Sequence, residues 1–175
     1  MNSSFVNDLR ITNSDVFASV KSAVVTTRIE LEAKLARAAL DTVDRKATIT
    51  IVGGTFVIAR PKGIVAGKDT GLAGEIRRVD AAAINHALSD GSIVLLSPLA
   101  YSASGEAFNM NALEMATAVA GEIHANKLVM YAEEGLRAAE NGAAIRQLTL
   151  QEARDLEVEN TSMARFIASA IRACQ

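Results

Sequence analysis

One short apolar run, from Ser92 to Ser97, constrains the fold of this chain more than any other feature. Turn-forming residues bound it on both sides, Asp90-Gly91 before it and Ser97-Pro98 after it. A run of this length between turn signals is typical of a buried strand in a parallel sheet. Ligands of open α/β sheets bind beyond the carboxyl ends of the strands. We therefore predict a parallel strand at 92–97, and we expect a ligand first in the loop from Ser97 to Asn111.

Composition limits the class of protein. The chain has 175 residues, half of them hydrophobic, and a formal net charge of −2. This length suits one domain with a real core, and the charge balance does not favour nucleic-acid binding. No apolar run approaches the ~18 residues of a membrane span, and the first residues lack the pattern of a secretory signal. The single cysteine, Cys174, cannot form an internal disulfide, so we expect a reducing, cytoplasmic location.

Periodicity and capping residues predict the remaining elements. The expected helices run from Asn13-Ser14-Asp15 to about Ala39, from Asp80 to about Ser89, from Asn111 to about Asn126 and from about Ser162 to Cys174. The expected strands are 47–52, 55–59, 75–79, 92–97 and 127–132, with the first two joined as a hairpin at Gly53-Gly54. The glycine-rich stretch 62–74 is predicted to be a mobile surface loop, and Thr149 and Glu152 form a capping-box pattern. The order of elements over 92–132 predicts a βαβ unit with a parallel crossover.

The short signatures of phosphate loops, dinucleotide-binding loops and zinc sites are all absent from the sequence. His86 and His124 stand alone on predicted helices, and a metal site needs three or four convergent ligands, so we expect surface positions and no metal. Ser102 and Ser104 have neither a nucleophile-elbow motif nor a nearby histidine. We therefore expect no catalytic residue of these types.

Arg77-Arg78 is the cationic pair of greatest interest. Neighbouring side chains of a strand point to opposite faces, so at most one of the two can serve a pocket. One alternative is that both are solvated or paired with Asp80 or Glu106. The other is that one guanidinium binds a carboxylate or a phosphate.

Asn109 and Asn111 lie where the predicted loop meets a helix. Helix capping is the simpler role for Asn111. Asn109 is freer to hydrogen-bond a ligand amide or carboxylate. The candidate ligand-binding residues are therefore Arg77, Arg78 and Asn109.

Several segments, in order and over almost the whole chain, resemble the amino-acid-kinase-like domain of bacterial N-acetylglutamate synthases. The segments that carry the resemblance are 7–12, 54–63, 74–80, 92–98 and 105–109. The resemblance implies a three-layer α/β/α sandwich around a mainly parallel sheet. It also implies that 1–175 is a partial domain, without the family's N-terminal strands, its domain end and its acetyltransferase domain. Members of the family make N-acetylglutamate from acetyl-CoA and glutamate, in arginine biosynthesis.

Related acetylglutamate kinases carry Asn-x-Asn-Ala-Asp where this chain has Asn109-Met110-Asn111-Ala112-Leu113. They typically end the next strand in Thr-Asp, where this chain has Tyr131-Ala132. Leucine cannot organise phosphoryl transfer as the aspartate does. The resemblance thus implies a regulatory domain without catalytic residues, with L-arginine as an effector and a homo-oligomeric assembly. Acetyl-CoA would be used by the longer protein, and no cofactor is expected in this segment. A degenerate acetylglutamate kinase and a ligand-free oligomerisation module are the alternatives.

Overall fold

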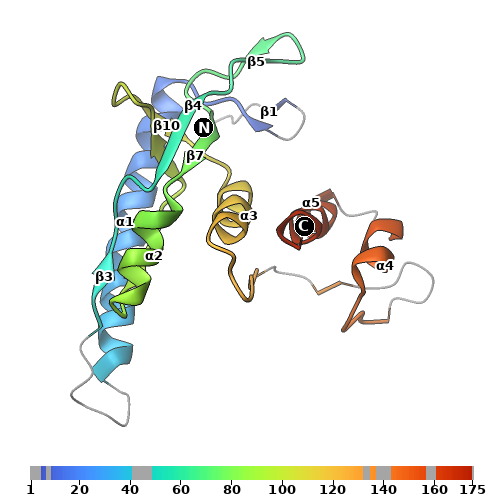
Figure 1. Ribbon diagram of the computed structural model, residues 1–175. Helices are drawn as coiled ribbons and strands as arrows, with labels where there is room; N and C mark the ends of the chain where they lie inside the picture. Colours follow the sequence, from blue (N-terminus) through green and yellow to red (C-terminus); the bar gives the residue numbers. More distant parts are fainter. Residues whose placement is uncertain are drawn as a thin grey trace. The chain divides into compact units, whose positions relative to one another are not determined.

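Figure 1 shows the computed structural model of the chain, which describes residues 5–6, 9–40, 49–131, 135–136, 143–156 and 161–174. It divides into two compact units, Met1–Ala112 and Leu113–Gln175. Each unit is described by itself below.

Helix α1, Ser14–Leu40, begins where the sequence predicts. The Asn13 side chain caps it, because Asn13 Oδ1 accepts a hydrogen bond from the Val16 amide at 2.9 Å. Phe17 is buried, but Val25, Ile29 and Leu31 are 54%, 61% and 41% exposed. Three apolar side chains of the helix are therefore left partly exposed. Strands β1, Phe5–Val6, and β2, Leu9–Arg10, pair in an antiparallel manner before the helix.

The largest sheet of the first unit has the order β10-β9-β4-β7. Its strands are β4 at Val57–Pro61, β7 at Gly74–Val79, β9 at Leu99–Tyr101 and β10 at Ala107–Asn109. β4 runs parallel to β9 and antiparallel to β7, and β9 and β10 are antiparallel. A parallel bridge between Ala73 and Asn109 links the start of β7 to the end of β10. The sheet therefore curls back on itself.

The inner face of this sheet forms the core of the first unit. Phe108, Ala59 and Ala73 are each 1% exposed. The backbone comes close to Phe108 at Gly74, where a β-carbon would lie 2.6 Å from Phe108 Cβ and 2.7 Å from Met110 Sδ. Only glycine fits at this position without displacing its neighbours.

Strands β3, Ile51–Val52, and β8, Ile93–Val94, form a separate parallel pair. The parallel strand predicted from the apolar run is confirmed, but it is shorter than 92–97 and only half-buried. The predicted hairpin at Gly53-Gly54 is wrong, because β3 pairs with β8 and not with β4. Residues 47 and 48 of the predicted first strand lie outside the described residues.

Two segments that the sequence predicts to be loops are hairpins. Within 62–74, β5 at Ile64–Val65 pairs with β6 at Lys68–Asp69. Ala66 and Gly67 turn the chain with φ of 48° and 75°, as a two-residue hairpin turn requires. The predicted ligand loop, 97–111, instead contains the antiparallel strands β9 and β10. Backbone pairing orders both segments, so the assignment of each as a loop is wrong, while the expectation of a ligand at 97–111 stays a prediction.

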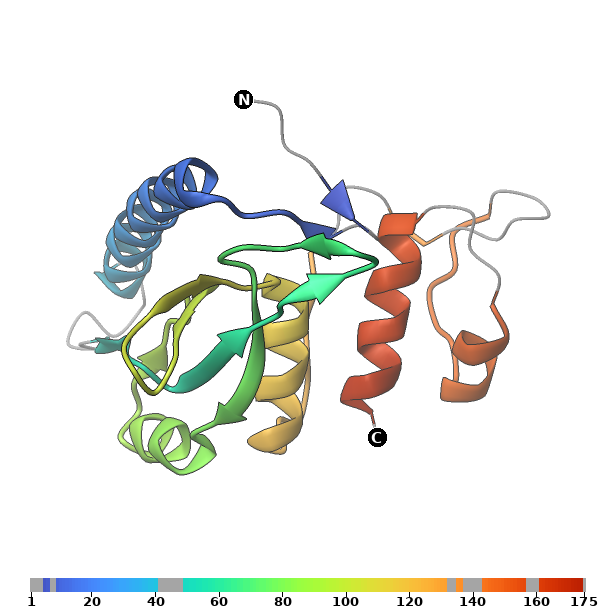
Figure 2. The same ribbon diagram turned by 90° about the horizontal axis from the view of Figure 1, so that it is seen from above.

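Helix α2, Ala81–Ser89, confirms the prediction of a cap at Asp80, whose carboxylate accepts from the Ala83 amide at 3.0 Å. Ile84 is its buried anchor, at 1% exposure. Seen from above, the strands of the largest sheet lie between α1 and α2, while the β1–β2 and β5–β6 pairs project to one side (Figure 2). This layering agrees with the predicted α/β/α fold class.

The second unit is mainly helical. Helix α3, Ala112–Glu122, is shorter than the predicted 111–126, and His124 follows it with a positive φ of 52°. Helix α4, Leu150–Asp155, begins with the predicted capping box, and α5, Thr161–Ala173, closes the chain as expected.

The strand predicted at 127–132 does not form over 127–131, and Ala132 lies outside the described residues. Val129 is 61% exposed and Tyr131 is 92% exposed. The predicted βαβ unit is therefore wrong for the described part of 92–132, because a strand needs a paired neighbour that these residues lack.

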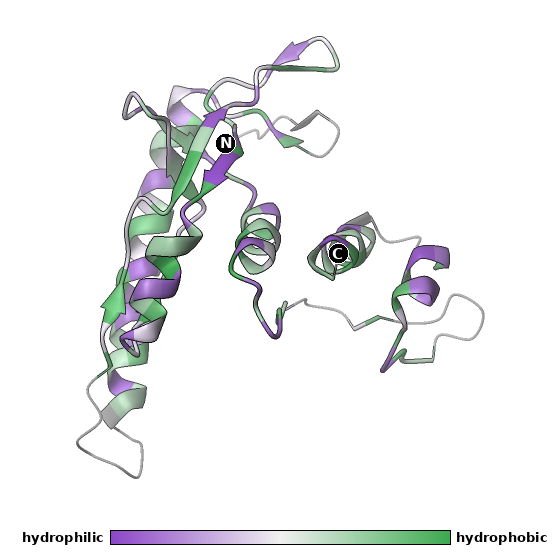
Figure 3. Ribbon diagram, viewed as in Figure 1, coloured by the Kyte–Doolittle hydropathy of each residue, from purple (hydrophilic) through white to green (hydrophobic). Residues whose placement is uncertain are grey.

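Coloured by hydropathy, α1 shows apolar residues mixed with polar ones along its length (Figure 3). Among the helices in the described ranges, none has the length and apolarity needed to cross a lipid bilayer.

Candidate functional site

Asn109 lies at a junction of three chain segments in the first unit. Its backbone amide donates to the Leu72 carbonyl at 2.8 Å, and its side-chain Nδ2 donates to Thr12 Oγ1 at 3.1 Å. Thr12 is fully buried. The Thr12 amide donates to the Thr70 carbonyl at 3.1 Å, and the Thr12 hydroxyl donates to the Arg10 carbonyl at 3.2 Å. These bonds join the residues before α1 to the segment before β7 and to the end of β10.

The Asn109 side chain therefore has a structural partner as well as a candidate ligand role. One amide N–H is used by Thr12, and a carboxamide has a second N–H and a carbonyl oxygen to offer. Among the described residues, Asn109 Oδ1 has no recorded hydrogen bond. A ligand that donates to this oxygen would fit the predicted role.

Arg77 and Arg78 both lie on β7, and both side chains are exposed. The strand register shifts here: Ile58 faces Arg78, and the next residue of β4, Ala59, faces Ile76. Arg77 is thus the extra residue of a β-bulge, and the simple alternation that we used to place the two side chains on opposite faces does not apply to it. No ion pair of either arginine, with Asp80 or Glu106 or otherwise, is found among the described residues.

The structure does not bring Arg77 and Arg78 to Asn109. The bridge to Asn109 is made at Ala73, and Arg77 lies four residue steps further along the extended chain. At the rise of a strand, this is roughly 13 Å. On the same sheet, Arg60 of β4 and Glu75 of β7 face each other and form an ion pair, with Arg60 Nε 2.6 Å from Glu75 Oε1.

The third feature of the first unit is the cavity next to Arg28, which the sequence does not predict. Arg28 of α1 lies at the carboxyl end of β3, where a β-carbon on Gly53 would coincide with the guanidinium group. Arg28 Nε donates to Glu32 Oε1 at 2.8 Å. A cavity of about 190 Å³ adjoins Arg28, lined by residues of α1 and by residues 95–98 after β8. The only sequence signal was the Arg28–Glu32 spacing, which also fits an ordinary helix-surface ion pair.

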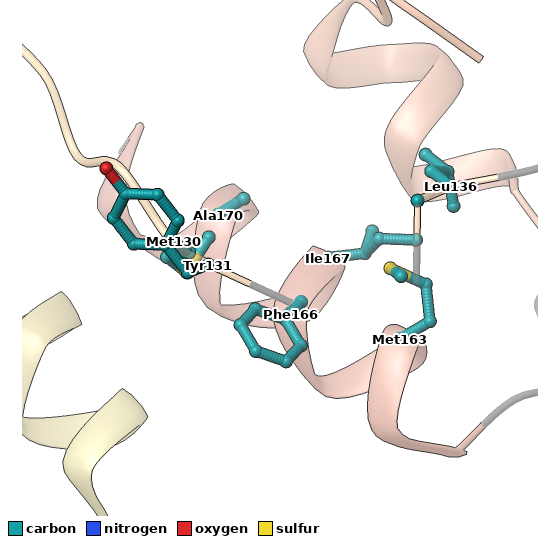
Figure 4. Close-up of a pocket in the computed structure, with 8 residues that line it drawn as sticks. Met130, Tyr131, Leu136, Met163, Phe166, Ile167 and Ala170 are labelled. Carbon is teal, nitrogen blue, oxygen red and sulfur yellow. The ribbon is translucent and has the colours of Figure 1, made fainter. Parts of the chain in front are cut away.

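An apolar groove of about 410 Å³ lies in the second unit, between α5 and the segments around Met130 and Leu136 (Figure 4). Met163, Phe166 and Ile167 of α5 line one side of it. Among the described residues, no charged side chain lines the groove.

The remaining candidates are placed as follows. The His86 side chain is 80% exposed, with Nε2 4.0 Å from Asp90 Oδ2. The hydroxyls of Ser102 and Ser104 lie 2.8 Å apart, and Ser102 Oγ accepts from the Glu106 amide at 3.1 Å, which stabilises the β9–β10 turn. No group of three or more potential metal ligands occurs within the parts of the chain that the structure describes.

One carboxyl group has a shifted pKa. The Thr149 amide and then the Thr149 hydroxyl donate to the Glu152 carboxylate, and together they lower the pKa of Glu152. This pair forms the capping box of α4, so the shift has a structural cause.

Residues 7–175 match the amino acid kinase family. The chain belongs to this family. The match covers nearly the whole of both units, and it agrees with the predicted fold class.

Several relatives of this chain are named amino-acid acetyltransferases. It is 38% identical over 171 residues to an amino-acid acetyltransferase of Pseudomonas paraeruginosa, and 37% identical over 174 residues to one of Ectopseudomonas mendocina. These alignments cover 96% and 98% of this chain but only 39% and 40% of the relatives. The chain thus spans about two fifths of the length of the relatives that it matches.

Solved structures also show similarity to an N-acetylglutamate synthase. N-acetylglutamate synthase from Neisseria gonorrhoeae, complexed with coenzyme A and L-arginine, superimposes with a TM-score of 0.89 at 31% identity. The match covers 98% of this chain and 40% of that chain. The smu.665 protein of Streptococcus mutans matches with a TM-score of 0.78 at 26% identity, over 99% of this chain and 69% of that one. The predicted similarity to N-acetylglutamate synthases is confirmed.

Proposed function

We propose that this chain is the regulatory, non-catalytic amino-acid-kinase-like portion of an N-acetylglutamate synthase. The longer protein would transfer the acetyl group of acetyl-CoA to the amino group of glutamate, in arginine biosynthesis. The observation that carries the proposal is 38% identity to an amino-acid acetyltransferase over 96% of this chain. Acetyl-CoA would bind to another part of the longer protein, and no cofactor would bind to this segment.

The residues at the kinase positions support a role without phosphoryl transfer. Leu113, in the first turn of α3, stands where related kinases carry an aspartate. Phosphoryl transfer depends on charged groups and metal ions that hold the phosphates in line. A half-buried leucine supplies neither charge nor a metal ligand.

L-Arginine is the effector that we propose. The Neisseria gonorrhoeae neighbour is described with coenzyme A and L-arginine bound. No residue of this chain is assigned to L-arginine; Asn109, through Oδ1, and separately Arg77 or Arg78 are proposed only as candidates for binding a ligand amide or carboxylate. A cytoplasmic location fits this biosynthetic role.

A homo-oligomer is the proposed assembly. Val25, Ile29 and Leu31 are exposed on α1, and exposed apolar helix surface favours association between copies. Sedimentation equilibrium should give a mass above that of one chain, and Ile29→Glu should lower it.

Two assays test the function. Isothermal titration of L-arginine into the longer protein should show saturable heat, and acetyl transfer from acetyl-CoA to glutamate should fall as L-arginine rises. Incubation with ATP and N-acetylglutamate should give no phosphorylated product. Phosphoryl transfer that disappears in Asn109→Ala would overturn the proposal.

A degenerate acetylglutamate kinase is the second candidate, because Asn109, Asn111 and Ala112 match the kinase pattern and only Leu113 departs from it. Phosphoryl transfer by the Leu113→Asp variant, with none by the parent chain, would favour this candidate over the regulatory domain. A ligand-free oligomerisation module would give association without any L-arginine heat.

A further inference from the structure

The cavity between α1 and residues 95–98 belongs to the first unit and is lined by none of the candidate residues Arg77, Arg78 and Asn109, although Ser97 and Pro98 begin the segment in which the sequence predicts a ligand. It lies at the carboxyl ends of two adjacent parallel strands. β3 ends at Val52 and runs into Gly53-Gly54, and β8 ends at Val94 and runs into 95–98. In α/β sheets this edge is where small molecules bind.

The walls of the cavity are mainly apolar. Val24 and Leu31 contribute one wall from α1, and Leu95 and Leu96 contribute the other. At about 190 Å³, the space equals the liquid volume of about six water molecules, taking ~30 Å³ each. The cavity is therefore large enough for a small aliphatic ligand of about six to eight non-hydrogen atoms.

Three polar side chains accompany this apolar surface: Arg28, Thr27 and Ser97. Neither hydroxyl has a hydrogen-bond partner among the described residues. A mostly apolar pocket with a few convergent polar groups is the usual composition of a small-molecule site.

The Arg28 guanidinium is held in place from two sides. Glu32 Oε1 accepts from Nε at 2.8 Å. The terminal nitrogens lie over Gly53, where a β-carbon would be 1.9 Å from one and 2.6 Å from the other. Gly53 therefore makes room for the guanidinium, and the terminal N–H groups have no recorded acceptor among the described residues. A planar pair of N–H donors is the geometry that a carboxylate matches with two parallel hydrogen bonds.

We propose that this cavity binds a small aliphatic carboxylate, with Arg28 as the anion contact and Thr27 and Ser97 as further hydrogen-bond donors. The aliphatic part lies against Val24, Leu31 and the residues after β8. The proposal does not depend on L-arginine regulation or on acetyl transfer, because it involves other residues.

Isovalerate is the probe, since its seven non-hydrogen atoms match the cavity, and isopentylamine is the matched cation. Each is titrated into the isotopically labelled 175-residue chain, and amide chemical shifts are followed. Isovalerate should give saturable shifts at Thr27 and Ser97, and isopentylamine should give none there. Equal binding of the two compounds, or no saturable shift with isovalerate, would overturn the proposal.

Removing the charge of Arg28 and removing that of Glu32 should change isovalerate affinity in opposite directions. Arg28→Gln should weaken isovalerate binding about tenfold or more, because a charge-assisted hydrogen bond is lost. Glu32→Gln should tighten it several-fold, because a negative charge next to the bound carboxylate is removed while the glutamine amide oxygen can still accept from Arg28 Nε. Arg37→Gln, on the same helix but outside the cavity, is the control and should leave binding unchanged. A purely apolar cavity would bind equally in all three variants.

A variant that fills the cavity tests the proposal without changing Arg28. Ala23 lines the cavity from an exposed position on α1, so Ala23→Leu should abolish isovalerate binding while thermal unfolding stays near that of the parent chain. Retained binding in this variant would place the ligand elsewhere and refute the assignment.

Discussion

Gly71→Ala is the substitution whose cost can be worked out most directly, because the structure contains a matched control at Gly67. Both glycines have left-handed backbone conformations, with φ of 62° at Gly71 and 75° at Gly67. A β-carbon on Gly67 would have no neighbour within 4 Å, whereas one on Gly71 would lie 2.5 Å from the Thr12 carbonyl oxygen. The two substitutions thus share the conformational cost and differ in the steric one.

The shared cost is roughly 1–2 kcal/mol for an L-residue in the left-handed region, offset by ~0.4–1 kcal/mol from the reduced freedom of the unfolded chain. Gly67→Ala should therefore destabilise by about 0–1.6 kcal/mol. Gly71→Ala adds overpacking against a backbone atom, at about 1–3 kcal/mol. The Thr12 carbonyl cannot move freely, because it accepts from the Leu72 amide at 2.7 Å.

Urea unfolding followed by far-ultraviolet circular dichroism measures the free energy of each variant. Hydrogen exchange of the Thr12 amide, which donates to Thr70, reports on the junction itself. We expect Gly71→Ala to unfold at lower urea than Gly67→Ala and to exchange faster at Thr12. If both variants shifted the midpoint equally and Thr12 exchange were unchanged, the close approach of Gly71 to Thr12 would be refuted.

Three further predictions follow from local contacts. Asp80→Ala should cost about 1 kcal/mol in urea unfolding, because α2 loses its capping carboxylate, while Asp80→Asn should cost less. Phe108→Ala should cost about 3–5 kcal/mol in the same assay, because it empties the centre of the curled sheet. The lowered pKa of Glu152 stabilises the start of α4 above the ordinary carboxyl pKa, and this contribution is lost as the pH falls through the lowered value. Carbon-detected titration should show this pKa, and Thr149→Ala should raise it because one donor is removed.

The helix starts were predictable because their determinants are adjacent in the sequence. Asn13, Asp80 and Thr149 each accept from an amide three residues later. Because both partners of such a bond lie within one helical turn, the local sequence is enough to predict where the helix begins. The family resemblance could also be identified from the sequence, because it rests on several short motifs that occur in the same order. The predicted strand at 127–132 failed for the opposite reason: alternation and apolarity favour a strand, but only a neighbouring strand forms one.

Gly53-Gly54 shows most clearly what the sequence could not reveal about the site. A pair of glycines between two β-branched runs favours a hairpin turn, yet Gly53 has a different use here. Its missing side chain gives room to the Arg28 guanidinium, which comes from a helix 25 positions earlier in the chain. Arg28 itself was visible only as half of a helix-surface ion pair. Neither residue indicates a site alone; the cavity arises because β3 pairs with β8 and brings both strand ends against α1. A glycine that permits a turn and a glycine that permits a close approach look identical in sequence, and only strand pairing distinguishes them.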